Sequence, residues 1–291
     1  MALRSVRDLV LAADAGRVHS QRFFKNAGAT GDGQWQDWSF SSGQPAYDAR
    51  IGGALAFTPF VAARNDAIFY PGIPDGMERR ITGVDVATIP GGTGQTNVEF
   101  SLYDLIGVYP LIDGDSTDLQ EMDNTATLPR YADGAGVFPV LVNHVAPVLS
   151  AANVAVEYVN SDGVTRSVTW AATANGQNKV CYTTATGGTS GPLYCALAGG
   201  DRGVRAISSI QFATAPGGLW AIYLCRPLAS FANRGGQPAV TVTATAERSF
   251  ALQNGFNMPL VPDGAWLGFF YMPNGSARTV AMHGQMHFAW G

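Results

Sequence analysis

One twelve-residue stretch occurs twice in this chain, and it constrains the fold more than any other feature. Residues 81–92 read ITGVDVATIPGG and residues 207–218 read ISSIQFATAPGG. Further along, the segment at 128–135 matches the one at 258–265. Self-matches in the same order indicate a duplicated unit. The repeat therefore predicts two related domains, and the alternative is chance similarity between loops of a common type.

The repeated unit predicts a strand, a glycine-rich turn and a return strand. In both copies, apolar residues alternate with other residues in the second half of the expected strand, as in a half-buried β-strand. The Pro-Gly-Gly that follows is typical of a turn, because proline fixes φ and glycine accepts a positive φ. An apolar run follows each turn, at 98–108 and at 219–224.

Closely spaced turn signals separate short β-type segments along the whole chain. One hairpin is explicit, because residues 154–159 alternate, 160–163 (NSDG) form a turn and 166–170 return. This pattern predicts an all-β protein with two tandem, related β-sandwich (jelly-roll-like) domains. We place the first sandwich at residues 66–147 and the second at residues 148–291.

Residues 1–65 are expected to form an N-terminal helix and an extended arm. Ser5 is a suitable helix N-cap and Gly16 a suitable stop. The aromatic residues that follow lie among glycines and prolines, and their apolar surface favours packing over exposure. We expect the helix and arm to contact their own domain or a neighbouring subunit. The candidate interface residues are Val6, Leu9, Leu11, Trp35, Trp38 and Phe40.

The composition narrows the classes of partner. Charged residues make up only 14% of the chain, the net charge is −4 and no basic run is present, so nucleic-acid binding is not expected. No apolar run is long enough to span a bilayer, so no membrane association is expected. A low charge density is typical of a subunit that hides surface in an assembly, so we expect a homo-oligomer.

The densest carboxylate cluster suggests one metal. Calcium binds several oxygen ligands, so Asp113, Asp115 and Asp118 are calcium candidates. Their spacing is not that of an EF-hand loop. We favour the alternative, a solvated acidic loop that caps a short helical turn at 119–122.

No motif predicts an enzyme or a cofactor. His283 and His287 are four residues apart, but in a strand that spacing separates them by ~13 Å, so no metal site is expected. For Cys181, Cys195 and Cys225 we expect free buried thiols, with a local Cys181–Cys195 disulfide as the alternative. Paired carboxylates of a glycosidase depend on tertiary structure and stay a minor hypothesis.

Several segments resemble a group of structural proteins of tailed bacteriophages. They are residues 109–120 (YPLIDGDSTDLQ), 128–134 (LPRYADG), 203–207 (GVRAI) and the closing FAWG. The resemblance spans most of the chain and carries no catalytic motif. It implies a virion component, made in the host bacterial cytoplasm and belonging to the head or the head-proximal module.

These observations lead to one main hypothesis and one alternative. The main hypothesis is a capsid decoration (cement) or minor capsid protein, which would stabilise the shell through contacts with the major capsid protein or other virion proteins. The alternative is a tail, baseplate or receptor-binding protein with an aromatic glycan site.

Overall fold

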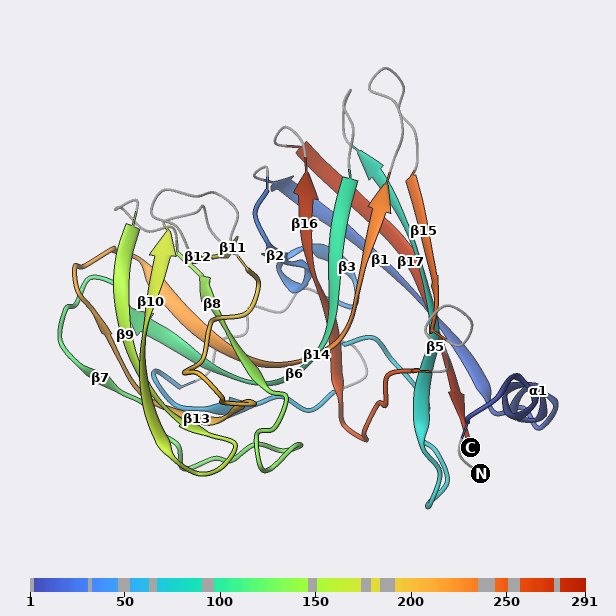
Figure 1. Cartoon of the computed structure of the whole chain (residues 1–291). Coiled ribbons are helices and arrows are strands. Elements are labelled where there is room, and N and C mark those ends of the chain that lie inside the picture. Colours follow the sequence, from blue (N-terminus) through green and yellow to red (C-terminus); the bar gives the residue numbers. More distant parts are fainter. Residues whose placement is uncertain are drawn as a thin grey trace.

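Two long strands, β6 (Asn97–Asp113) and β14 (Leu219–Arg234), pair antiparallel along almost their whole length and run through the middle of the molecule (Figure 1). This computed structural model describes residues 3–30, 33–46, 53–62, 67–90, 97–145, 151–173, 179–183, 192–234, 244–250, 257–274 and 278–291.

The other elements are mostly strands. Helix α1 spans Val6–Asp14, and the 3-10 turn η1 spans Trp38–Phe40. The strands are β1 (Val18–Thr30), β2 (Gln36–Asp37), β3 (Ser42–Gln44), β4 (Thr58–Pro59), β5 (Arg79–Pro90), β7 (Gln120–Glu121), β8 (Phe138–Asn143), β9 (Ala151–Asn160), β10 (Thr165–Thr173), β11 (Lys179–Val180), β12 (Tyr182–Thr183), β13 (Val204–Phe212), β15 (Ala244–Ser249), β16 (Trp266–Asn274) and β17 (Arg278–Trp290). The prediction of an all-β protein is confirmed.

The strands form three sheets. The terminal sheet, named for its two strands nearest the chain ends, has the order β15-β5-β17-β1-β3. The second sheet has the order β12-β10-β9-β13-β7. We call it the central sheet because its strands come from the middle of the sequence, although it lies at one end of the molecule (Figure 1). The third sheet has the order β14-β8-β11-β2-β16-β6, with β4 added at β6, and the pairing of β14 with β6 closes it into a six-stranded barrel.

Each outer sheet covers one end of the long strand pair. Val98, Phe100 and Leu102 at the start of β6 belong to the core that packs under the terminal sheet. Ile106 and Ile112 further along β6 belong to the core under the central sheet. A third core, with side chains from β6, β8, β11, β14 and β16, fills the barrel. The long strands are therefore buried on both faces, which accounts for their almost continuous apolar sequences.

The two repeated stretches occupy related positions. The first copy forms β5 and leads to β6, and the second forms β13 and leads to β14. The turn of the second copy has positive φ at Gly217 and Gly218, as predicted, whereas the Gly-Gly of the first copy lies outside the described residues. The two return strands pair with each other. The two strands of each copy do not pair with each other, because β5 and β13 lie in the terminal and central sheets whereas β6 and β14 lie in the barrel. Each copy therefore leads the chain from an outer sheet into the barrel.

This arrangement does not confirm a tandem duplication of two separate sandwiches. Strand β8 precedes the predicted boundary at residue 147 but pairs with β14, which follows it. Strand β16 near the C-terminus pairs with β6, and β17 pairs with both β1 and β5. The sheets therefore combine segments from the ranges 1–65, 66–147 and 148–291. The physical reason is that strands join where their buried faces match, which sequence order alone does not determine.

The N-terminal region is integrated into the fold. Helix α1 forms as predicted, and the Ser5 hydroxyl accepts a hydrogen bond from the Asp8 N–H. The segment that follows does not lie as an arm on a finished domain, because β1 is an interior strand between β17 and β3. Trp38 in η1 is only 1% exposed and packs against Phe23 and Phe269.

A buried ion pair lies near the middle of β6. Asp104, the one acidic residue in the apolar part of this strand, accepts two hydrogen bonds from the Arg130 guanidinium, at 3.0 and 2.7 Å. The Trp266 N–H donates to the same carboxylate at 2.8 Å. Arg130 also donates to the carbonyls of Phe60 and Leu105. Because both charges are fully partnered, their burial is tolerated.

Candidate functional site

The outer face of the terminal sheet carries exposed aromatic, cationic and amide side chains. Strand β17 alternates strictly there: Met282 and Met286 point into the core, whereas His283, Gln285 and His287 point outward. Since β17 lies between β1 and β5, its outward side chains lie beside the outward side chains of both neighbouring strands.

A hollow of about 740 Å³ lies on this face. We call it the groove. It is lined mainly by Arg22, Phe24, Gln44, Asp85, His283 and Gln285. Phe24 is 37% exposed, and its ring lies 4.6 Å from that of His283, centroid to centroid, at an angle of 48°. Cross-strand pairing explains the contact, because Phe24 is directly opposite His283, and Gln44 is opposite Phe24 on the other side.

Glycine at position 284 shapes the floor of the groove. Its neighbours across the sheet are Phe23 and Val86. A Cβ at this position would collide with the Phe23 ring and with the carbonyl oxygen of Asp85. The missing side chain lets Phe23 pack beneath the sheet, so that the outward residues on either side of Gly284 stand above a closed core.

A row of polar side chains borders the groove. The Ser20 hydroxyl oxygen is 2.8 Å from His287 Nδ1, and His287 Nε2 is 2.8 Å from an oxygen of Asp85. Serine, histidine and aspartate are also the groups of a catalytic triad. Acyl transfer further requires donors aimed at a developing oxyanion, and this row lies on an open sheet face. Its structural effect is to link β1, β17 and β5.

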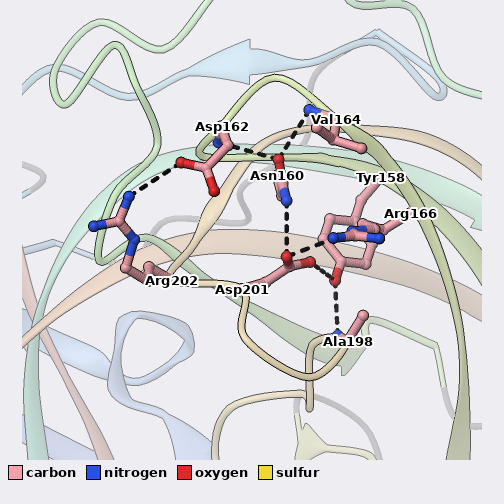
Figure 2. Close-up of polar contacts among 8 residues, drawn as sticks. All are labelled: Tyr158, Asn160, Asp162, Val164, Arg166, Ala198, Asp201 and Arg202. Atoms are coloured by element: carbon pink, nitrogen blue, oxygen red, sulfur yellow. Dashed lines mark hydrogen bonds and ion pairs between the residues drawn. The ribbon is translucent and has the colours of Figure 1, made fainter.

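The central sheet has its own polar cluster at the end of the β9–β10 hairpin, shown in Figure 2. Asp201 accepts hydrogen bonds from Tyr158 at 2.5 Å and from Asn160 at 2.7 Å, and lies 3.6 Å from Arg166. These two hydrogen bonds, that of Tyr158 first, hold the pKa of the Asp201 carboxyl below its usual value. Burial and the hydrogen bond to Asp201 raise the pKa of Tyr158 to about 12.

The remaining contacts of this cluster close the predicted turn. Asn160 accepts at one oxygen from the N–H groups of Asp162 and Val164, and the Ala198 N–H donates to the Tyr158 hydroxyl (Figure 2). The predicted hairpin is confirmed by the register of β9 and β10. Since its polar atoms bond one another, the cluster stabilises a turn and presents little to a ligand.

The acidic loop does not gather into a cation site. The Asp115 N–H donates to Asp113, and the Asp118 N–H donates to the Ser116 hydroxyl. Among the residues that the structure describes, no group of three or more metal-ligating side chains comes together. The helical turn expected at 119–122 is wrong, because these residues contain β7, and the Gln120 amide bonds both backbone groups of Asp113.

The six candidate interface residues differ in exposure. Trp38 is buried, and Trp35, Phe40 and Leu9 pack partly against the cores of this chain. Val6 and Leu11 remain exposed on α1 together with Val10. Exposed apolar side chains therefore gather on the helix, and their role as an interface stays a prediction.

Two further expectations concern cysteines and membranes. Cys181, Cys195 and Cys225 are buried thiols, as predicted, and the alternative Cys181–Cys195 disulfide is not formed. Burial raises the pKa of the Cys195 thiol, so this group stays protonated and unreactive at neutral pH. In the described ranges no helix has the length and apolarity needed to cross a bilayer.

Sequence reasoning did not find the groove. The alternation of His283, Gln285 and His287 was visible in the sequence and indicated one outward face of a strand. Nothing in the sequence indicated that this face adjoins Phe24 and Arg22, which lie more than 250 residues earlier.

Comparisons with known proteins add little. No protein-family model matches the sequence, and no curated protein matches it. Solved structures of infectious bursal disease virus are similar over 94% of this chain and 80% of theirs: that of the Gt strain at 9% identity and a TM-score of 0.20, and the VP2 subviral particle at 11% and 0.19. TM-scores this low do not indicate a shared fold.

Proposed function

We propose that this chain is a structural component of a bacteriophage particle, and specifically a capsid decoration or minor capsid protein. The sequence resemblance to tailed-phage structural proteins supports this role. The structural observation that carries it is an uncovered apolar surface at α1, where Val6, Val10 and Leu11 are between 39% and 53% exposed. Exposed apolar side chains that lie close together mark a protein contact.

The proposed mechanism is mechanical. Leu9 and Ala12 of α1 belong to or pack on the core under the terminal sheet, so the helix is anchored on one side. Its other side would bury Val6 and Val10 against the major capsid protein, another virion protein or a second copy of this chain. Each fully buried apolar side chain contributes roughly 1.5–3 kcal/mol, and many copies on one shell would add up to a stabilising lattice.

A substitution that spares the fold tests this role. We expect Val10→Glu to release the chain from purified particles of the encoding phage while its melting temperature stays close to that of the wild type. Val164→Glu is the matched control, because Val164 is similarly exposed, 47% against 53%, and lies at the other end of the molecule in the β9–β10 turn. Absence of the wild-type chain from purified particles, or full retention of Val10→Glu, would contradict the proposal.

A truncation that tests the role of α1 must end before β1. Deletion of residues 1–65 would remove β1 and Trp38 and would unfold the terminal sheet. Deletion of residues 1–15 removes α1 and leaves every strand in place.

A tail, baseplate or receptor-binding role is the second candidate, and the groove favours it. Labelling of the chain in intact particles separates the two: label on the head supports a decoration or minor capsid role, and label at the tail tip supports receptor binding.

A further inference from the structure

The groove on the terminal sheet combines an aromatic surface with polar side chains that point outward. Phe24 presents a partly exposed ring, braced by His283 at 4.6 Å. The side chains of Arg22, Gln44 and Gln285 make no hydrogen bond or ion pair with the residues that the structure describes. A volume of about 740 Å³ is in the range of small-molecule sites.

These groups have a common recognition chemistry. A ring face accepts the apolar C–H face of a ligand, and amides supply both donors and acceptors in one plane. A guanidinium supplies several donors in a fixed geometry. A sugar ring offers a matching pattern, since it has an apolar C–H face and a rim of hydroxyl groups that both donate and accept.

The charges of the groove favour a neutral ligand. Arg22 contributes a positive charge, and Asp85, on the neighbouring side of the sheet, contributes a negative charge that His287 already contacts at 2.8 Å. A polyanion would meet the Asp85 carboxylate, and a cationic peptide would meet the Arg22 guanidinium. Both classes are therefore disfavoured.

We propose that this groove binds a neutral saccharide, with Phe24 as the stacking platform and Arg22, Gln44 and Gln285 as hydroxyl-binding groups. This site is distinct from the apolar surface of α1, so the proposal holds whether or not the chain is a capsid subunit.

The test uses the full chain on an array of neutral and acidic oligosaccharides, followed by calorimetric titration with the neutral oligosaccharide that binds best. We expect Phe24→Ala to weaken binding at least about tenfold, equivalent to about 1.4 kcal/mol. Phe24→Tyr should retain binding, because it keeps the ring face. Gln285→Ala should weaken binding by a smaller factor, because it removes one amide.

Val18→Ala is the matched control, because Val18 is an exposed residue on the same strand but does not line the groove. It should leave the affinity unchanged, and thermal unfolding of every variant checks that the fold is retained. Binding of no oligosaccharide, binding of acidic ones only, or equal affinity of Phe24→Ala and the wild type would overturn the proposal.

Discussion

The terminal and central sheets cover the two ends of the same strand pair, but their outer faces carry different side chains. The terminal sheet exposes an aromatic ring, a guanidinium, two imidazoles and several amides around a hollow of about 740 Å³. The central sheet exposes mainly short side chains, such as Asn153, Ala155 and Thr169, around a hollow of about 460 Å³.

The polar groups of the two sheets also differ in how far they are satisfied. Around Asp201, whose side chain is only 3% exposed, the hydrogen-bonding groups bond one another and close a turn. Around Phe24, several polar side chains lack partners among the described residues. The contrast teaches that a polar cluster whose groups bond one another contributes to stability, whereas outward polar groups over a hollow are available to a ligand. Four substitutions probe the comparison.

The largest effect is expected at the buried ion pair on β6, the strand that contributes to the cores under both outer sheets. Arg130→Ala leaves Asp104 charged and buried without its partner, so we expect a loss of about 3–5 kcal/mol in the free energy of unfolding. Urea unfolding, followed by both tryptophan fluorescence and circular dichroism, measures this loss and should show a single transition. Arg202→Ala is the control, because its pair with Asp162 is exposed and contributes about 0–1 kcal/mol. Equal losses in the two variants would contradict the expectation.

The next effect tests how the terminal sheet closes beneath the groove. Gly284→Ala introduces a Cβ against the Phe23 ring and the Asp85 carbonyl, so we expect a destabilisation of about 1–3 kcal/mol. Gly199→Ala in the loop before β13 meets no atom within 4 Å and should change stability by less than about 0.5 kcal/mol. Chemical denaturation compares the two. If Gly284→Ala left the free energy of unfolding unchanged, the Phe23 ring would have to move to make room for the new methyl group.

A smaller, pH-dependent effect is expected at the saturated cluster of the central sheet. Because hydrogen bonds lower the folded-state pKa of Asp201 below 3.8, the carboxylate stabilises the fold above that pH, and this contribution is lost as the pH falls through the lowered value. The melting temperature of Asp201→Asn should therefore lie below that of the wild type at neutral pH, and the difference should narrow in acid. Asp162→Asn, at an exposed position, is the control. A difference that stays constant with pH would refute this role of the carboxylate.

The smallest effect is expected for the row that borders the groove. His287 is 32% and Asp85 47% exposed, so we expect His287→Ala to cost no more than about 1 kcal/mol. Thermal unfolding measures this, with Ser20→Ala as a companion variant that removes only the hydroxyl at the other end of the row. A loss comparable to that of Arg130→Ala would mean that the row, rather than the core, holds the terminal sheet together.

Local sequence patterns predicted much of the secondary structure. The Ser5 cap and the β9–β10 hairpin were predicted at the right residues, because the capping hydroxyl and the Asp-Gly turn act over a few positions. The helical turn predicted at 119–122 was wrong, because Gln120 and Glu121 pair with β13 as the short strand β7, and the Gln120 side chain bonds the backbone of Asp113.

Local sequence patterns could not predict where the candidate site forms. Ser20 and His287 are 267 positions apart, and Phe24 meets His283 only because β1 pairs with β17 in one register. A shift of that register by one residue would turn the outward side chains of one strand into the core.

The sequence by itself determined that this is an all-β chain with a capped N-terminal helix, a repeated stretch that forms a strand in both places, and buried thiols. These properties follow from side-chain periodicity, turn residues and composition, which act locally or on average. Only the tertiary structure decided that the two return strands pair with each other, that the barrel closes, and that the groove forms between β1, β17 and β5. The reason is that strand partners are selected by complementary buried faces and hydrogen-bond register across the whole chain.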